Sequence, residues 1–243
     1  MKDYIFGKQP CISALQGDRK VSKVLIANTS KNNEVVALCK KSNVKYDFVP
    51  HEELDKITNH KNHQGVVCYV SEFQYTELDD LLYKLRDKKE PLLLILDGVE
   101  DPVNFGSLIR TCSCFNVDGI IIAKDRQVQV TPTVTKISTG ALEFVPIVRV
   151  TNINTTIERL KKERFWIVAT DGKGDKYHDE INYSGPIALI VGSEGRGISK
   201  LTLKNSDFVI KIPISGPITS LNASIAGAIV ISQIASYRRH HSK

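Results

Sequence analysis

The sequence predicts an α/β protein in which a small N-terminal module precedes a larger domain built on a mostly parallel sheet with helices on both faces. Short apolar segments alternate with amphipathic segments along the chain, which is the pattern of strands and helices in α/β folds. In the C-terminal two-thirds the apolar segments are nearly continuous, as expected of strands covered on both faces. A charged stretch between the two regions indicates a domain boundary.

The N-terminal region carries short strand and helix patterns over its first seventy residues. Strands are predicted at 21–27, 45–49 and 65–70, and helices at 33–41 and 52–58. The composition then changes to a charged connector that is compatible with a helix. We therefore divide the chain into a small α/β module at 1–72, a linker at 73–90 and a larger domain at 91–243.

The larger domain repeats the strand–helix pattern from residue 91 onward. Strands are predicted at 91–96, 119–123, 145–150, 166–170, 187–191 and 208–212. Helices are predicted at 105–115, 131–139, 155–163 and 222–237. Parallel sheets of this kind bind ligands in the loops beyond the carboxyl ends of their strands, so functional residues are expected there.

The charge balance is mildly basic. Lys and Arg number 33 against 27 Asp and Glu, which gives a formal net charge of +6 and a pI near 9.0. A basic surface gathers polyanions by releasing their counterions, so the charge permits a nucleic-acid partner. It does not require one, and a basic enzyme without such a partner remains an alternative on this evidence.

The five cysteines form neither a metal-binding nor a disulfide pattern. The chain has no Cys-x-x-Cys pair and no histidine at zinc-ligand spacing beside a cysteine, so no metal is expected. Free, reduced thiols are typical of cytosolic proteins. The first residues lack the apolar core of a signal peptide, and no apolar run approaches the roughly 20 residues that span a bilayer. We expect a cytoplasmic protein with no membrane partner.

The first of three polar loops that follow predicted strands is 96–110. Asn104 is placed to cap the following helix, Gly106 lets other groups approach its first turn, and Arg110 lies further along the helix. Considered alone, the loop is better explained by a helix cap and a solvated arginine than by a catalytic site.

The second loop, 190–199, has three glycines around Glu194. It lacks the Gly-Lys-Ser/Thr ending of a phosphate-binding P-loop. No Gly-x-Gly-x-x-Gly follows the first strand of the domain, so a nicotinamide-dinucleotide site is not expected. Glu194 is then either a turn residue or a group that orients a ligand.

The third loop, 212–224, leads from a strand into a helix rich in Ala, Ser and Gly. Ser220 and Asn222 are both natural N-cap residues for that helix. Its small residues allow close packing against another backbone, either within one subunit or across a dimer.

In this order, the three loops resemble the three signature motifs of the SpoU–TrmH family of RNA 2′-O-methyltransferases, in the SPOUT superfamily. The motif residues are 104–110, 192–195 and 220–224, and further similarity lies at 97–102, 138–141 and 146–152. The resemblance covers about residues 91–237. Residues 1–70 resemble the ribosomal-protein-like, RNA-binding domain of the subgroup that methylates a guanosine ribose in 23S rRNA.

The resemblance implies a fold, an assembly and a cofactor. The C-terminal part of the sheet would form a deep trefoil knot, and a homodimer would complete each active site across the subunit interface. The cofactor would be S-adenosyl-L-methionine, and no metal would be needed. The residues that would enclose the cofactor are Thr170, Gly172, Gly192, Glu194, Ile212, Ser220 and Leu221.

The resemblance also implies a catalytic set, which is Asn104, Arg110, Glu194, Ser220 and Asn222. The family assigns activation of the ribose 2′-hydroxyl to the arginine at the position of Arg110. A guanidinium is almost always protonated and is a poor general base. Arg110 is therefore expected to stabilise the developing alkoxide or to hold the adjacent phosphate, and the identity of the proton acceptor stays open.

Two other functions fit the same scaffold. A tRNA ribose 2′-O-methyltransferase is one, although the N-terminal module favours rRNA. A non-catalytic, RNA-binding ribosome-assembly factor is the other, and the presence of all five catalytic residues argues against it. Outside the motifs, Lys124, Arg126 and Arg149 are either phosphate contacts or solvated charges, and His60 and His63 are either RNA contacts or loop residues without a role.

Overall fold

The structure is a computed structural model, and it describes residues 3–29 and 31–241. Its internal contacts divide the chain into two compact units. One unit comprises Met1–Gln74 and Val130–Phe144, and the other comprises Tyr75–Gln129 and Val145–Lys243. The domain boundary that the composition indicates stays a prediction. The grouping of Val130–Phe144 with the smaller unit was not indicated by the sequence.

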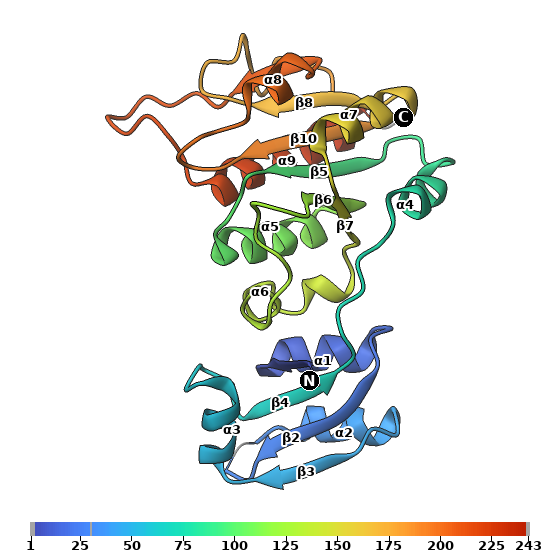
Figure 1. Ribbon diagram of the computed structural model, residues 1–243, viewed down its shortest axis with the longest axis vertical. Coiled ribbons are helices and arrows are strands. Elements are labelled where there is room, and N and C mark those ends of the chain that lie inside the picture. Colours follow the sequence, from blue (N-terminus) through green and yellow to red (C-terminus); the bar gives the residue numbers. More distant parts are fainter. Residues whose placement is uncertain (1–2, 30, 242–243) are drawn as a thin grey trace. The chain divides into compact units, whose positions relative to one another are not determined.

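The smaller unit is built on a four-stranded mixed sheet with the order β1-β4-β2-β3 (Figure 1). β4 pairs antiparallel with β1 and β2, and β2 pairs parallel with β3. Its elements are β1 (Asp3–Phe6), α1 (Lys8–Gln16), β2 (Val21–Ala27), α2 (Asn33–Lys41), β3 (Tyr46–Val49), α3 (His51–Thr58), β4 (Val66–Val70), α6 (Pro132–Ile137) and the 3-10 helix η1 (Ala141–Glu143).

Both faces of the small sheet are covered. Apolar residues of α1 and α2, such as Ile12 and Val35, pack with Val24 on one face. On the other face Leu54 of α3 packs with Leu25 of β2. β1 and α1 were not predicted. All of residues 10–15 in α1 are buried, so that helix has no amphipathic period to reveal it.

The segment Val130–Phe144 is held to the small unit by polar contacts. Lys61 Nζ donates to Thr133 Oγ1 over 3.0 Å, and Lys136 Nζ donates to Gln64 Oε1 over 2.9 Å. A buried ion pair joins Arg19 to Glu143 at 3.5 Å. The segment leaves the second unit after β6 and returns to it at β7. The chain therefore passes between the two units three times.

The larger unit contains a seven-stranded sheet in which every pairing is parallel, with the order β7-β6-β5-β10-β8-β11-β9. Its strands are β5 (Leu92–Asp97), β6 (Gly119–Ala123), β7 (Ile147–Val150), β8 (Trp166–Thr170), β9 (Lys176–Tyr177), β10 (Ile187–Gly192) and β11 (Phe208–Lys211). Its helices are α4 (Leu78–Leu85), α5 (Pro102–Cys114), α7 (Ile153–Lys162), α8 (Lys200–Lys204) and α9 (Ala223–His241).

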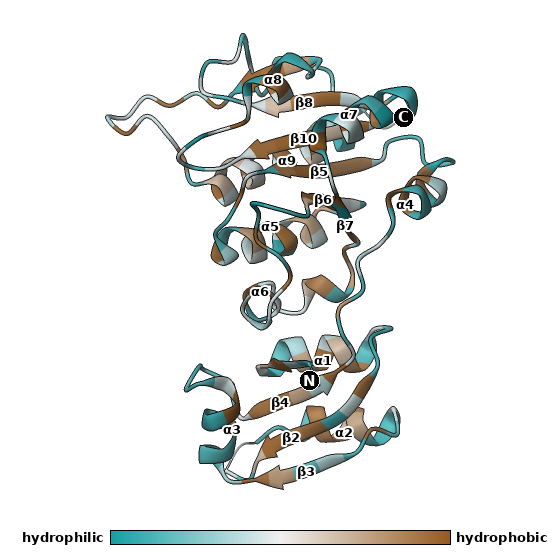
Figure 2. Ribbon diagram, viewed as in Figure 1, coloured by the Kyte–Doolittle hydropathy of each residue, from teal (hydrophilic) through white to brown (hydrophobic). Residues whose placement is uncertain are grey.

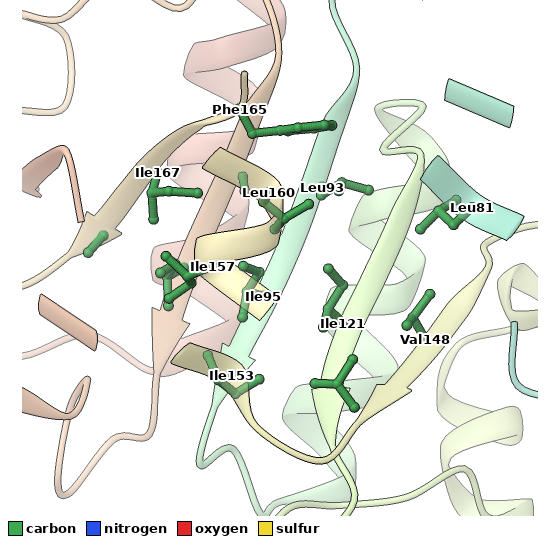
Figure 3. Packing of buried hydrophobic residues seen from close by; sticks show 14 of the residues in the cluster. Leu81, Leu93, Ile95, Ile121, Val148, Ile153, Ile157, Leu160, Phe165 and Ile167 are labelled. Carbon is green, nitrogen blue, oxygen red and sulfur yellow. The ribbon is translucent and has the colours of Figure 1, made fainter. Parts of the chain in front are cut away.

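Helices cover both faces of this sheet, as predicted. Figure 3 shows one face, where Leu81 of α4 and Ile157 and Leu160 of α7 pack on the strands. On the other face α5 and α9 pack together, with Gly227 of α9 so near Leu108 of α5 that a Cβ on the glycine would lie 2.6 Å from Leu108 Cδ2. Hydrophobic residues accordingly run the length of β5 and β10 (Figure 2).

Most predicted elements of the larger domain are present with small shifts of their ends. α9 continues to His241, and the predicted linker holds α4. The short β9 and α8 were not predicted, because two and five residues are too few to show a period. The trefoil knot stays a prediction. Among the described residues no helix combines the length and apolarity needed to cross a membrane.

The cysteines are free thiols, and four of the five are buried. Cys112 and Cys114 point to different faces of α5, as expected from their spacing, since Cys112 is buried and Cys114 is exposed. Burial raises the pKa of the Cys112 thiol well above its usual range. The four buried thiols therefore behave as small apolar core residues.

Candidate active site

The first two polar loops lie side by side because their strands are neighbours in the sheet. Asp97, at the end of β5, lies opposite Gly192, at the end of β10. Ser193 N donates to Asp97 O over 3.2 Å, and Ser199 N donates to Asp97 Oδ2 over 3.0 Å. Both loops therefore begin at one point of the carboxyl edge, where the parallel sheet was expected to bind its ligand.

Three side chains, one from each polar loop, form a closed hydrogen-bonded group. Asn104 Nδ2 donates to Glu194 Oε1 over 3.0 Å, and Asn222 Nδ2 donates to Asn104 Oδ1 over 2.7 Å. Asn222 Nδ2 also donates to Glu194 Oε1. Asn104 is buried, whereas Glu194 and Asn222 are exposed. The structure thus brings together three of the five predicted catalytic residues.

The predicted capping role of Asn104 is wrong. Asp101 caps α5, and its Oδ2 accepts a hydrogen bond from Asn104 N over 3.0 Å. The helix begins earlier because Pro102, which lacks an N–H and has a fixed φ, is suited to its first position. Asn104 lies inside the first turn, and its amide is free to reach Glu194. The Asp-Pro pair in the sequence was the signal for this boundary.

Asn222, in contrast, caps α9 as predicted. Its Oδ1 accepts from Ser224 N over 2.9 Å and from Ile225 N over 3.3 Å. One amide therefore fixes the start of the helix with its oxygen and joins the site with its nitrogen. Ser220 does not share the cap, since it has no hydrogen bond within the described residues.

A pocket of about 170 Å³ lies between the ends of β8, β10 and β11 and the segment that leads into α9. Its wall includes all seven residues predicted to enclose the cofactor, which are Thr170, Gly172, Gly192, Glu194, Ile212, Ser220 and Leu221. The rest of the wall is mainly aliphatic, with Val191, Ile210 and Ile214. The predicted cofactor residues, spread over fifty positions of sequence, are thus brought to one cavity.

The turn at Gly192 accepts no larger residue. A Cβ on Gly192 would lie 2.4 Å from the carbonyl carbon of Gly197 and 2.5 Å from Ile198 N. The backbone therefore doubles back on itself at the end of β10, and Ser193 and Gly197 form an isolated bridge there. Glu194 lies within this turn and lines the wall of the pocket.

A second pocket, of about 280 Å³, adjoins the first. It is lined by Gly98–Asp101, Asn104, Ser193–Arg196 and Ala223. Ser193, Glu194 and Ala223 line both pockets. Glu194 therefore lies at the junction of two cavities, with Asn104 beside it in the second, and a group transferred between two bound molecules would pass this junction.

Arg110 is not part of this group within one chain. It lies six residues beyond Asn104, about 9 Å further along the axis of α5, and its side chain is exposed. It lines neither pocket, and among the described residues it has no hydrogen bond or ion pair.

Several residues of the site were not singled out in the sequence. Asp97 ties the two loops together, Asp101 caps α5, and Ser193 lines both pockets. Glu100 and Arg196 form an ion pair of 3.2 Å between the first and second loops. Position at a strand end was the available signal for Asp97, but nothing local indicates which residue on another loop each side chain meets.

One group in the described small unit has the composition of a metal site. His51 Nδ1 and His63 Nε2 each lie 3.1 Å from an oxygen of Asp55. However, Gly65 N donates to His63 Nδ1 over 3.0 Å, so the neutral ring carries its proton on Nε2 and donates it to Asp55. A metal at Nε2 would have to displace that proton, so the group is better explained as structural.

On the sequence alone, His60 and His63 are each either an RNA contact or a loop residue without a role. His60 is exposed, so both alternatives stay open for it. His63 is buried, so it cannot contact RNA. Burial alone would raise the pKa of the Asp55 carboxyl, but the hydrogen bonds from His51 and His63 outweigh it and hold the pKa below its usual value.

Models of two protein families match almost the whole chain. The SpoU rRNA Methylase family matches residues 91–232, and the family described as RNA 2′-O ribose methyltransferase substrate binding matches residues 4–76. YacO of Bacillus subtilis (strain 168), assigned to the TrmH family of tRNA/rRNA methyltransferases, is 41% identical over 243 residues, which span 98% of this chain and 96% of that protein. A relative from Staphylococcus aureus (strain COL) is 38% identical over 242 residues, with the same coverage.

Solved structures share the fold. The SpoU methyltransferase AviRb from Streptomyces viridochromogenes, solved with AdoMet, superimposes with a TM-score of 0.83 at 22% identity, over 98% of this chain and 91% of that chain. An rRNA methyltransferase from Sinorhizobium meliloti gives a TM-score of 0.79 at 25% identity, over 99% and 88%.

The two-domain α/β architecture and the three converging loops define a SPOUT-type methyltransferase. The chain belongs to the SpoU rRNA methylase family, which includes the TrmH proteins, and it is an RNA methyltransferase of that family. The family resemblance found in the sequence is thereby confirmed.

Proposed function

We propose that this protein transfers a methyl group from S-adenosyl-L-methionine to the 2′-oxygen of a ribose in RNA, and that the ribose belongs to a guanosine of 23S rRNA. One observation carries the proposal. Glu194 lines both of two adjoining pockets, and it is hydrogen bonded to Asn104, which lines one of them, and to Asn222. Such a junction suits the in-line transfer of a small group between a cofactor and a substrate.

The 170 Å³ pocket fits the cofactor by its chemistry. Its aliphatic wall, with Ile212 and Leu221, suits a flat base and an aliphatic chain. Gly172 leaves open space, since a Cβ there would meet nothing within 4 Å. When bound, S-adenosylmethionine supplies an electrophilic methyl group on a sulfonium. The AviRb structure with AdoMet supports this assignment.

The residues at the junction would position the ribose in the 280 Å³ pocket. Asn104 is fixed by its bonds to Glu194 and Asn222, so its amide is held before the substrate arrives. Glu194 Oε1 already accepts two hydrogen bonds, whereas Oε2 accepts none within the described residues. Oε2 is therefore available to a ribose hydroxyl and would hold its proton in the orientation that transfer needs.

We further propose that the active form is a homodimer whose second copy supplies Arg110 to the site. Arg110 is exposed without a partner in the described chain, although its family role is catalytic. Large apolar side chains are also exposed near the site on α5, α9 and the segment before α9, with fractions of 54% for Val103, 71% for Ile218 and 52% for Ile225. Burial of that surface against a second copy would bring a guanidinium to each alkoxide.

RNA as the substrate class rests on the family and on the substrate-binding model over residues 4–76. The choice of 23S rRNA rests on the resemblance of the small module to ribosomal-protein-like domains. We place the reaction in the cytoplasm, where reduced thiols such as the five free cysteines persist.

Methyl transfer to total RNA from a strain lacking this protein tests the proposal. Labelled S-adenosylmethionine should mark one ribose of 23S rRNA, and mapping of 2′-O-methyl sites should place it on a guanosine. Exclusive labelling of tRNA would overturn the rRNA assignment. The absence of transfer to any RNA, with cofactor bound, would instead favour the non-catalytic assembly factor.

The role of Arg110 is tested in the same assay. Arg110→Ala should lower the transfer rate about 100-fold or more, because a charge that stabilises the transition state is lost. Cofactor affinity, measured by calorimetry, should stay unchanged, since Arg110 does not line the cofactor pocket. Arg159→Ala, on α7 at the other face of the sheet, is the control. Full activity of Arg110→Ala would refute the assignment.

A further inference from the structure

A third hollow continues the row of two pockets. It has a volume of about 560 Å³ and is lined by Glu100, Arg126, Gln127, Val128 and Arg196. Glu100 and Arg196 also line the proposed ribose pocket. The three cavities therefore adjoin in the order of cofactor pocket, ribose pocket and a hollow with two guanidinium groups.

The loop that presents Arg126 is held firmly to the site. Val128 N donates to Val99 O over 3.1 Å, which ties it to the first polar loop. Gln129 Nε2 donates to Ala123 O over 3.1 Å, which closes the loop on itself. Arg126 lies at the exposed tip, and it has no ion pair or hydrogen bond among the described residues. The guanidinium of Arg126 is therefore free to bind an anion, and hydrogen bonds hold the loop that carries it in place.

The backbone of Arg126 is strained. Its φ is +55°, in the left-handed region where glycine is favoured and where the Cβ of any other residue comes too close to the following carbonyl oxygen. Strained backbone is often retained where a side chain has a function. The loop therefore holds Arg126 in a conformation that lowers stability, and binding by this side chain would explain why it is kept.

Arg196 supplies the second guanidinium. It is 81% exposed and pairs with Glu100 at 3.2 Å. Exposed ion pairs of this kind are weak, so a stronger anion can displace the carboxylate. With Arg126 unpaired in the described chain, the two arginines against one glutamate leave a net positive charge at this hollow.

We propose that this hollow binds a backbone phosphate of the RNA, one that flanks the methylated ribose. The inference rests on the proposed function. A flanking phosphate is covalently joined to the ribose, so its site must adjoin the ribose pocket, and the wall shared by Glu100 and Arg196 meets that requirement. Guanidinium groups bind phosphate in bidentate geometry, which positions the substrate without reading its sequence.

The test replaces Arg126 with glycine, the residue that its backbone conformation favours. Arg126→Gly removes the guanidinium and relieves the strained conformation, so the variant should fold at least as well as the parent. Its affinity for 23S rRNA from a strain lacking this protein should fall about fivefold to tenfold at low salt. The slope of log affinity against log salt should become shallower by about one, as expected for one lost phosphate contact. Cofactor affinity should not change.

Arg164→Gly is the matched control. Arg164 is also an exposed arginine at positive φ, +66°, but it precedes β8 at the amino edge of the sheet. Its replacement should change neither RNA affinity nor the salt slope. Glu100→Gln should act in the opposite direction from Arg126→Gly and tighten RNA binding about threefold, because it releases Arg196 from its ion pair.

Three outcomes would overturn the inference while leaving methyl transfer intact. The first is that Arg126→Gly leaves the slope of log affinity against log salt unchanged, although the parent protein methylates RNA. The second is an equal loss of affinity in Arg164→Gly, which would indicate a general charge effect. The third is an undiminished affinity of Arg126→Gly for 23S rRNA at low salt. Failure of the parent itself to transfer methyl groups would count against the proposed function instead.

Discussion

At the scale of single residues, the side-chain amide of Asn222 has two structural roles. Its oxygen caps α9, and its nitrogen bonds Asn104 and Glu194. Helix start and site geometry are thereby coupled, because any rotation of the amide that breaks the cap also moves the nitrogen away from the site. The exposure of Asn222 allows substrate to reach this coupled group.

Substitution of Asn222 can separate its role as helix cap from its role in the site. Asn222→Ala should lower the free energy of unfolding by about 1 kcal/mol through loss of the cap. It should also lower methyl transfer about 10-fold to 100-fold, because a hydrogen bond to a charged group is lost. Asn222→Ser should restore stability, since serine caps helices well, but should not restore transfer. Denaturant melts and single-turnover transfer measure the two effects. Equal recovery of both in Asn222→Ser would show that the nitrogen has no part in the site.

At the scale of elements, the 3-10 helix η1 is tied to the small unit through a desolvated carboxylate. Burial raises the pKa of Glu143, although the charge of the nearby Arg19 opposes the shift. The two side chains are 5% and 9% exposed and lie 3.5 Å apart, without a hydrogen bond between the closest atoms in the described structure. Desolvation of the two charges costs free energy, and their contact fixes where η1 lies within this unit.

The raised pKa of Glu143 predicts a direction for stability against pH. Between the unfolded pKa, near 4.5, and the higher folded pKa, the folded state binds more protons than the unfolded state. The contribution of Glu143 to the free energy of unfolding therefore falls as pH rises through that window. In denaturant melts, the free energy of unfolding of the parent minus that of Glu143→Gln should be larger at pH 4 than at pH 7. Exposed Glu158→Gln is the control and should show no such trend, and an opposite trend for Glu143→Gln would contradict the assigned environment.

At the scale of the whole molecule, the proposed site is incomplete in one chain. Arg110 lies apart from the pockets, and three large apolar side chains near the site are exposed, namely Val103 on α5, Ile225 on α9 and Ile218 in the segment before α9. A second copy that covers this surface would explain both features at once.

Sedimentation at micromolar concentration tests this assembly. The parent should sediment as a dimer, and Ile225→Asp should sediment as a monomer with methyl transfer reduced at least 10-fold, because a charge cannot be buried without a partner. Leu201→Asp is the control, since Leu201 is 56% exposed on α8 and lies outside the proposed surface. A monomeric parent with full activity would contradict the homodimer.

The sequence by itself determined the local structure and the chemical types of the site residues. Periodicity located most of the helices and strands, because burial of one face produces a regular spacing of apolar residues along the sequence. It failed for α1, whose residues 10–15 are all buried, and it misplaced the start of α5, where Asp101 and Pro102 decide the boundary. The motif loops were recognised because each is a short continuous stretch.

Only the tertiary structure decided which loops meet. Asn104 contacts Glu194 and Asn222 because β5 and β10 are adjacent in the sheet and α9 packs on α5, and strand order is not encoded in any local pattern. The same holds for the assignment of Val130–Phe144 to the small unit and for the row of three hollows. Contacts across about a hundred residues depend on the relative free energies of whole arrangements, which no single segment determines.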